Sequence, residues 1–431
     1  MSDSDSWKAS IDFALLSDVG MRRANNQDAV AAIPADSRAR FERRGHLFIV
    51  ADGMGAHAAG ELASRMAVEQ IPQHYFQAST LAAPEALRRA VQQANAEVYA
   101  RGRSNPEFHN MGTTVCALAL LAEGAVVAHV GDSRVYRLRG EKLEQLTFDH
   151  SLVWEMEASG QVSPNSALGR SIPKNVITRS LGPNSEVMVD LEGPWPIRKG
   201  DRYLLCSDGL SGEVDDSEMG MLLGCLPPEK AVRVLVDLAN LRGGPDNSTV
   251  LIVEALDDLT APSSSAALTE TDRSLPWPLM ITGAVCLIVA LFFGFLGMWP
   301  VMAITLVLFL VAAGFAVRHI LVPPDLGVTP CGATGGDRSG GGPYRKYVAK
   351  PNEQLIDRLG GTVRALREAA SENRWKIEWR EIDQYQQESS EAKKAGRLGD
   401  AVRLQAEAII ETMQQLRKER QRKADDSSLD L

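Results

Sequence analysis

Four aspartates stand where apolar segments of this chain begin or end. Asp52 closes the run "LFIVAD" and Asp208 closes "YLLCSD", each followed by glycine; Asp246 lies just ahead of "TVLIVEA", and Asp132 lies in "VGDSRV" between two apolar runs. Any one of them alone is typical of a plain turn. Brought together, four carboxylates would repel one another, and hard divalent cations such as Mg²⁺ or Mn²⁺ relieve that repulsion. The pattern therefore raises the hypothesis of an oxygen-ligated metal site, without the Cys/His cluster typical of zinc.

The segments around these aspartates predict an α+β domain. Helices are expected over 60–76, 84–100 and 229–242, with Pro84 opening the second. Because the strand-like runs cluster without regular alternation with helices, a layered α+β fold is favoured over a doubly wound sheet. Short runs rich in Val, Ile, Leu and aromatic residues predict the strands: "IDFALL", "LFIVAD", "TTVCALALL", "AVVAHV", "RVYRLR", "EVMVDLE", "YLLCS" and "TVLIVEA".

Composition limits the choice of partner and compartment. The 431 residues carry a formal net charge of −9 and no basic stripe, which argues against nucleic acid as a partner. The same acidic balance would repel a phosphorylated substrate, so a phosphate site needs local positive charge. Five widely spaced cysteines without CxxC argue against a disulfide framework and fit a reducing cytosol. The polar start "MSDSDSWKAS" lacks the apolar core of a secretory signal.

An uncharged stretch over residues 274–317 predicts a membrane hairpin. At ~1.5 Å per residue its length is about 66 Å, roughly two crossings of a ~30 Å hydrocarbon core. "GMWP" supplies a break, so two transmembrane helices are expected at about 277–297 and 299–317. Basic residues flank the pair and are absent from its short loop, which places both flanks in the cytoplasm. The alternative is a buried hairpin of a soluble protein, which would lack the polar face that soluble helices need.

The predicted domains are 8–256 for the α+β part, 257–275 for a linker, 276–318 for the two transmembrane helices, 319–343 for a Gly-rich linker and 344–425 for a helical region. The last part is expected to be a helical bundle or coiled coil. A faint likeness of "AKKAGRLGDAVRLQAEAI" to a tetratricopeptide repeat is the alternative, but such repeats need stacked neighbours. Two apolar stripes support the helices: Leu355, Leu359, Val363, Leu366 and Ala370, and Val402, Ile409, Met413 and Leu416.

The joint order of the motifs resembles the bacterial metal-dependent protein phosphatases of the 2C type, the PPM family. The matching segments are "SDVGMRRANNQDAV", "VADGMGAHAAGE", "MGTT", "VGDSRVYRL", "LTFDHSLV", "NVITRSLG", "LLCSDGLS" and "GGPDNSTV". The resemblance covers residue 11 to about 255, and together the segments are far more specific than any one of them. The resemblance implies a four-layer α-β-β-α sandwich with two antiparallel sheets, and hydrolysis of phosphoserine and phosphothreonine in proteins.

The resemblance also implies roles for the acidic residues. Two Mn²⁺ or Mg²⁺ ions would share a bridging water or hydroxide. Asp52 would bridge the ions and the Gly53 carbonyl would complete one shell, while Asp208 and Asp246 would hold the other ion. Asp132 with Asp208 would form a third, weaker site.

Other residues would support the reaction around the metals. Arg23 matches the family's phosphate-clamping arginine, with Arg22 as the alternative, and a guanidinium can hold two phosphate oxygens at once. His57 stands where the family's proposed general acid would be; the alternative is a histidine that caps the next helix or bonds a carboxylate. Asp28 would support the metal ligands from outside or bind a metal through water, and Asn247 would support the ligands from outside.

Such a site needs no side-chain nucleophile. Metal binding lowers the pKa of water from ~15.7 to about 7–9, and the sequence has no CxxxxxR phosphatase loop. Residues 150–172 resemble the family's mobile flap, with Gly160, Pro164 and Gly169 as pivots. Gln27 replaces a glutamate common among relatives and offers the second metal less charge.

The leading hypothesis is a phosphoprotein phosphatase anchored at the cytoplasmic face of the membrane and opposing a Ser/Thr kinase. Its expected partners are phosphorylated proteins and cognate kinases, and no nucleic acid. The first alternative is a non-catalytic sensor that binds phosphoproteins on the same fold. The second places the function in the C-terminal helices, as a module for partner binding or self-association.

Overall fold

The structure is a computed structural model, and it describes residues 10–55, 58–163, 166, 172–173, 176–259, 292, 295–296 and 341–428. The chain divides into two compact units, Met1–Ala261 with Gly332–Leu431, and Pro262–Cys331. The predicted hairpin lies outside the described residues except at 292, 295 and 296. Among the helices that the structure describes, none is both long and apolar enough to cross a membrane.

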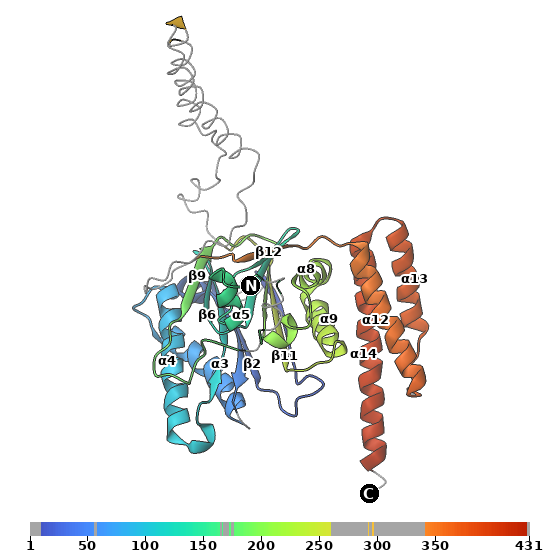
Figure 1. Cartoon of the computed structure of the whole chain (residues 1–431), viewed down its shortest axis with the longest axis horizontal. Helices are drawn as coiled ribbons and strands as arrows, with labels where there is room; N and C mark the ends of the chain where they lie inside the picture. Colours follow the sequence, from blue (N-terminus) through green and yellow to red (C-terminus); the bar gives the residue numbers. More distant parts are fainter. Residues whose placement is uncertain are drawn as a thin grey trace. The chain divides into compact units, whose positions relative to one another are not determined.

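Two antiparallel sheets form the centre of the first unit (Figure 1). One has the strand order β1-β11-β10-β7-β8-β12 and the other β2-β3-β5-β6-β9, with β4 paired to β3. The strands are β1 (Ile11–Asp18), β2 (Asp28–Ile33), β3 (His46–Met54), β4 (Gly112–Thr113), β5 (Val115–Leu121), β6 (Gly124–Val130), β7 (Arg134–Arg139), β8 (Lys142–Gln145), β9 (Asp190–Trp195), β10 (Arg202–Cys206), β11 (Ser248–Ala255) and β12 (Arg345–Val348).

Strand β3 shows why these segments are apolar throughout. Successive side chains of a strand point to opposite faces. Phe48 and Val50 pack into the core between the two sheets, whereas Leu47 and Ile49 pack into the core that the second sheet shares with its covering helices. A strand buried on both faces reads as a continuous hydrophobic run, which is why the sequence signal was strong here.

Helices cover the outer faces of both sheets. α3 (Ala59–Gln77) and α4 (Ala83–Ser104) pack on the second sheet, and α8 (Asp216–Cys225) and α9 (Pro228–Leu241) pack on the first. The three predicted helices are confirmed with small shifts at their ends. The predicted strand over 186–192 was misplaced, because the strand is Asp190–Trp195. The remaining short helices are α2 (Arg38–Arg44), η1 (Pro106–Phe108), α5 (Leu152–Ala158) and α7 (Asp208–Ser211).

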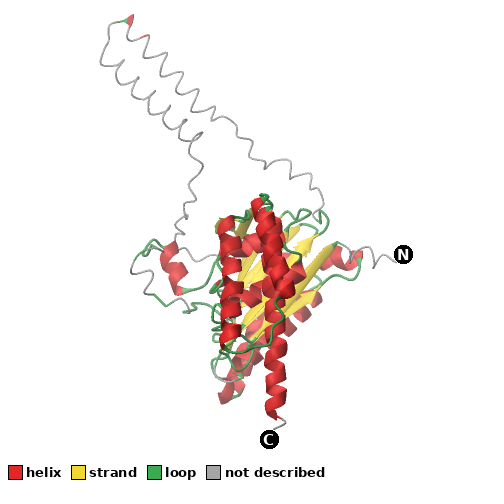
Figure 2. Cartoon of the chain, turned by 90° about the vertical axis from the view of Figure 1, so that its right-hand side faces the viewer, coloured by secondary structure: helices red, strands yellow, loops and turns green. Residues whose placement is uncertain are grey.

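The C-terminal helices pack against the first sheet's helices. They are α12 (Glu353–Glu372), α13 (Arg380–Lys394) and α14 (Leu398–Ser428), and they stand in front of the strands in Figure 2. Leu359 of α12 and Ile409 of α14, both from the predicted stripes, are fully buried in one core with residues of α8 and α9. Arg417 of α14 also pairs with the buried Asp237 of α9. The predicted helical C-terminal region is thus confirmed, and it shares a hydrophobic core with the α+β part.

Candidate active site

Asp28 and Asp52 face each other on neighbouring strands. Asp28 begins β2, Asp52 lies near the end of β3, and the two are register partners in an antiparallel pair. The backbone around Asp52 is fixed, because its N–H donates to Thr114 Oγ1 at 2.9 Å and its carbonyl accepts from the Thr114 N–H at 2.8 Å. The end of β3 therefore holds the Asp52 carboxylate in one position beside Asp28.

Asp208 and Asp132 reach the same place from the first sheet. Asp208 is the first residue of α7, directly after β10 and Ser207, whose hydroxyl donates to Asp28 Oδ2 at 2.7 Å. Asp132 lies in the turn between β6 and β7, where the chain passes from one sheet to the other, and it is 7% exposed. Both aspartates interact electrostatically with Asp52. The structure therefore brings acidic residues that are distant in the sequence together at one end of the sandwich.

Asp246 lies at the rim of this cluster with Arg23. Arg23 Nη2 donates to Asp246 Oδ2 at 2.7 Å, and the two side chains are 49% and 33% exposed. The next residue, Asn247, holds the loop between β1 and β2. Its Nδ2 donates to the carbonyls of Val19 and Asn25, and its Oδ1 accepts from the N–H of Gln27. Asn247 thus positions the loop that carries Arg23. Arg22, the alternative phosphate ligand, lies beside Gly243 instead.

The clustered carboxylates resist ionisation. Burial, followed by the nearby Asp208, raises the pKa of Asp28 and of Asp132 to about 7. Burial and the surrounding Asp28, Asp208 and Asp132 raise the pKa of Asp52 well above its usual value. Burial and the charge of Asp246 also raise the pKa of Asp208. Positive charge at this position would therefore stabilise the ionised carboxylates.

Gly53 is required by close packing. A Cβ on this residue would lie 2.1 Å from the carbonyl oxygen of Gly60 and 2.5 Å from that of Gln27. Backbone contacts this close exclude any side chain, so glycine lets the start of α3 approach the end of β3. This packing reason is independent of the predicted role of the Gly53 carbonyl as a metal ligand.

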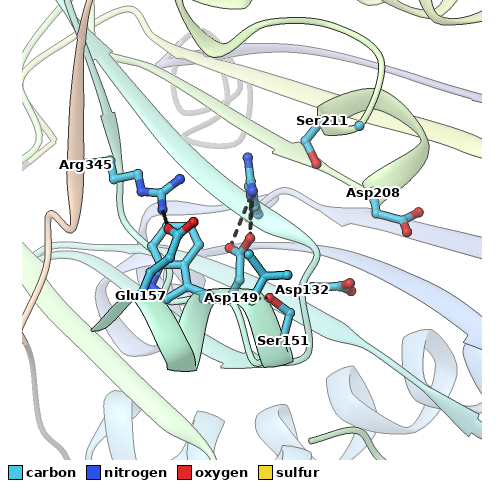
Figure 3. Close-up of a pocket in the computed structure, with 11 residues that line it drawn as sticks. Asp132, Asp149, Ser151, Glu157, Asp208, Ser211 and Arg345 are labelled. Carbon is cyan, nitrogen blue, oxygen red and sulfur yellow. Dashed lines mark hydrogen bonds and ion pairs between the residues drawn. The ribbon is translucent and has the colours of Figure 1, made fainter. Parts of the chain in front are cut away.

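A cleft of about 310 Å³ adjoins the cluster. Figure 3 shows Asp132 and Asp208 at one end of it, with Ser211 of α7 on one side and Ser151 and Glu157 of the α5 side opposite. An ion pair holds one wall in place, because Nε and Nη2 of Arg134 both donate to Asp149, which is 4% exposed. The volume lies within the range of ligand sites, about 300–1,000 Å³.

The comparison with protein families identifies the fold and its chemistry. A family model described as protein phosphatase 2C matches residues 21–239. The chain belongs to the protein phosphatase 2C family. It is a protein serine/threonine phosphatase of the 2C type, a metal-binding hydrolase, so the alternative of a non-catalytic sensor is not retained.

Known relatives match the N-terminal part of this 2C phosphatase. The serine/threonine phosphatase stp of Listeria monocytogenes is 39% identical over 240 residues, which cover 54% of this chain and 93% of that protein. The Streptococcus agalactiae serine/threonine phosphatase structure has 33% identity and a TM-score of 0.50, covering 57% of this chain and 99% of that one. The catalytic domain of the phosphatase PstP, solved with two manganese ions, has 33% identity and a TM-score of 0.48, with 57% and 99% covered.

The aspartates of this 2C phosphatase fit divalent cations. Asp28, Asp132 and Asp208 each have a buried carboxylate oxygen, Oδ1, without a hydrogen-bond partner. Leaving such oxygens unpaired is costly, and a cation would satisfy them. In the described part of the chain, no group of three or more Asp, Glu, His or Cys side chains lies in an arrangement that could hold a metal ion directly. The unpaired oxygens and the crowding of the carboxylates are the features of this cluster that fit a cation.

The predicted residues and the residues of the cleft overlap only in part. His57, Pro164 and Gly169 lie outside the described residues. Gly160 has a positive φ of 72° just after α5, in the segment that resembles the flap. The sequence analysis missed the residues that wall the cleft. These residues are Arg134, Asp149, Ser151, Trp154, Glu157, Ser211 and Arg345. The motif "VGDSRVYRL" could have indicated Arg134. No sequence signal indicated Arg345, which lies far from every phosphatase motif along the chain.

Proposed function

We propose that this phosphatase hydrolyses phosphoserine and phosphothreonine in proteins with two divalent cations, Mn²⁺ or Mg²⁺, held by Asp52, Asp208 and Asp246. The observation that carries the proposal is the buried carboxylate cluster with its unpaired oxygens at the end of a cleft. When bound, such cations supply positive charge that activates a water molecule and neutralises the phosphate. Asp132 with Asp208 would hold a third, weaker ion, and the Gly53 carbonyl would complete one shell.

The residues of the chain itself bind and orient the substrate. The Arg23 guanidinium is half exposed at the rim, so it can turn from Asp246 to grip two phosphate oxygens. The positive charge of Arg23 attracts the phosphate dianion, which the net negative charge of the protein would otherwise repel. Asn247 holds the loop that carries Arg23 by hydrogen bonds to its backbone, and the Ser207 hydroxyl orients Asp28. His57 is proposed as the proton donor to the departing serine or threonine oxygen.

The proposed location is the cytoplasmic face of the membrane. The support is the sequence alone: residues 274–317 carry no charge and basic residues flank them on both sides. An anchored phosphatase would act on phosphoproteins made by Ser/Thr kinases in the same compartment. Fractionation of cells that express the chain with and without residues 274–317 tests the location, and an unchanged distribution contradicts it.

Asp52→Asn in the full-length protein tests the chemistry. The change keeps the size of the side chain and removes its charge, so phosphate release from p-nitrophenyl phosphate and from a phosphothreonine peptide should fall at least about a hundredfold. Manganese binding, measured by calorimetry, should weaken in parallel. Asp36→Asn, on an exposed aspartate paired with Arg40, is the matched control and should behave as wild type. Turnover that persists in Asp52→Asn, or that needs no divalent cation, would refute the proposal.

A further inference from the structure

A segment far beyond the family match contributes to the cleft. Residues 341–349, here called the C-terminal arm, follow the second compact unit and precede α12. The family match ends at residue 239. The arm nevertheless lies along the α+β part, and one of its side chains, Arg345, lines the same cleft as Asp132 and Asp208. The arm is therefore a component of this active site that the family resemblance does not supply.

The start of the arm is fastened to a buried carboxylate. Glu192 of β9, which is 2% exposed, accepts hydrogen bonds from the N–H groups of Gly341 and Gly342 at 2.9 and 3.1 Å. The hydroxyl of Tyr344 donates to its other oxygen. The Tyr344 ring also contacts Phe148 edge-on, with centroids 5.5 Å apart. A buried acid satisfied by three donors from one segment fixes that segment firmly.

The middle of the arm extends the first sheet. β12 pairs with β8, with Arg345 opposite Gln145 and Val348 opposite Lys142. The ladder is continued at both ends, because the Tyr344 N–H donates to the Gln145 carbonyl and the Ala349 N–H to that of Glu141. Ala349 is 4% exposed and belongs to the core shared with α8 and α12. The arm thus covers the free edge of β8, the kind of edge that proteins seldom leave bare.

The register of β12 directs Arg345 to helix α5. Its guanidinium pairs with Glu157 at 2.7 Å and lies over the Trp154 ring, 3.8 Å from the centroid. Figure 3 shows this pair at the end of the cleft away from Asp132 and Asp208. Lys346, the next residue, is exposed and lies 3.8 Å from Glu144 of β8. Of these two neighbouring residues, Arg345 contacts α5, whereas Lys346 lies near an acidic side chain at the surface.

We propose that the C-terminal arm completes the protein-substrate cleft, with Arg345 as the positioning residue that fixes α5 beside the metal carboxylates. The inference rests on the proposed function, and it adds a substrate dependence to it. Trp154 and Glu157 form the α5 wall of the cleft. The residues that flank a phosphoserine or phosphothreonine extend along that wall, whereas a small aryl phosphate occupies only the end with the carboxylates and Arg23. Arg345 therefore matters more for a phosphopeptide than for an aryl phosphate.

The test compares two substrates in matched variants of the full-length protein. The measured quantity is kcat/KM for a phosphothreonine peptide divided by kcat/KM for p-nitrophenyl phosphate. Loss of a stacked and ion-paired guanidinium in Arg345→Ala should lower this ratio about tenfold, mainly through a higher KM for the peptide. Arg345→Lys, which keeps the charge but not the planar stack, should recover part of the loss. Lys346→Ala removes a cation from the same strand and should leave the ratio within twofold of wild type.

Hydrogen exchange provides a second measurement that does not need turnover. The backbone amides of α5 should exchange faster in Arg345→Ala than in Lys346→Ala. Equal ratios and equal exchange in these two variants would overturn the positioning role. Wild-type protein inactive on both substrates with manganese would instead contradict the proposed function, and the exchange comparison would still decide the role of Arg345.

Discussion

His46 makes a quantitative prediction about acid stability. It begins β3, is fully buried, and packs on Phe41 with ring centroids 5.0 Å apart. Its Nδ1 accepts the N–H of Ala35 at 2.9 Å, a bond that the imidazolium could not accept. Burial lowers the pKa of His46 from 6.5 to about 4. The unfolded chain therefore binds the proton more tightly, so the stability from this residue is complete above pH 6.5 and is lost as pH falls toward 4.

The size of this loss follows from the two pKa values. Their difference, at ~1.36 kcal/mol per pH unit, gives about 3 kcal/mol between pH 6.5 and pH 4. His46→Gln keeps an acceptor for the Ala35 N–H and cannot gain a proton. Urea denaturation at pH 7.5, 5.5 and 4 should show the free energy of unfolding falling less steeply in His46→Gln than in wild type. The difference between the two proteins should change by about 3 kcal/mol across this window.

Comparison with wild type separates His46 from the other groups that titrate over the same range. His109→Gln is the matched control, because His109 is exposed in the folded protein and in the unfolded chain. Its pH dependence should follow wild type. If His46→Gln and wild type lose stability in parallel from pH 6.5 to pH 4, the assignment of a neutral, buried His46 is wrong.

Two further predictions concern the loop that carries the phosphate arginine and the docking of the last helix. Asn247→Ala removes a buried amide that makes three hydrogen bonds to that loop, so urea denaturation should show a loss of about 2 kcal/mol in unfolding free energy, and kcat for p-nitrophenyl phosphate should fall. Arg417→Met leaves the carboxylate of Asp237, which is 0% exposed, without its partner; because Arg417 is one-third exposed, we expect a loss of about 1–3 kcal/mol. Adding Asp237→Asn should restore most of that stability, and an unimproved double variant would contradict the pairing.

Some of the strands that the sequence predicted well have apolar residues that are buried on both faces. "TVLIVEA" became β11, between β1 and β10. The misplaced strand at 186–192 fails for a local reason. The two residues just before it are held by a side chain, since Asn95 Nδ2 donates to the carbonyls of Asn184 and Ser185. Met188 is 46% exposed, so its apolar character did not indicate burial.

Long-range pairing was less accessible than local structure. The apolar stripes of α12 and α14 predicted helices, but a stripe does not specify which surface covers it. "RKYV" of β12 is short and polar, so nothing in its pattern marked a strand or its partner β8. The same limit holds in the site: the motif aspartates were visible, whereas the register that sets Asp28 opposite Asp52 depends on the pairing of an alanine-rich strand.

The distribution of the aspartates links metal binding to the sandwich itself. Asp28 and Asp52 come from the second sheet, Asp208 and Asp246 from the ends of strands in the first, and Asp132 from the turn that connects the two. The apolar core between the sheets holds these carboxylates together against their mutual repulsion. A ligand that binds only the folded protein stabilises it, so cations held by this cluster would tie the two sheets together at the end where the carboxylates push them apart. The arm closes the other side of the same cleft through Arg345. The catalytic end of the molecule is thus built from both sheets and from the C-terminal segment, and its geometry depends on all three.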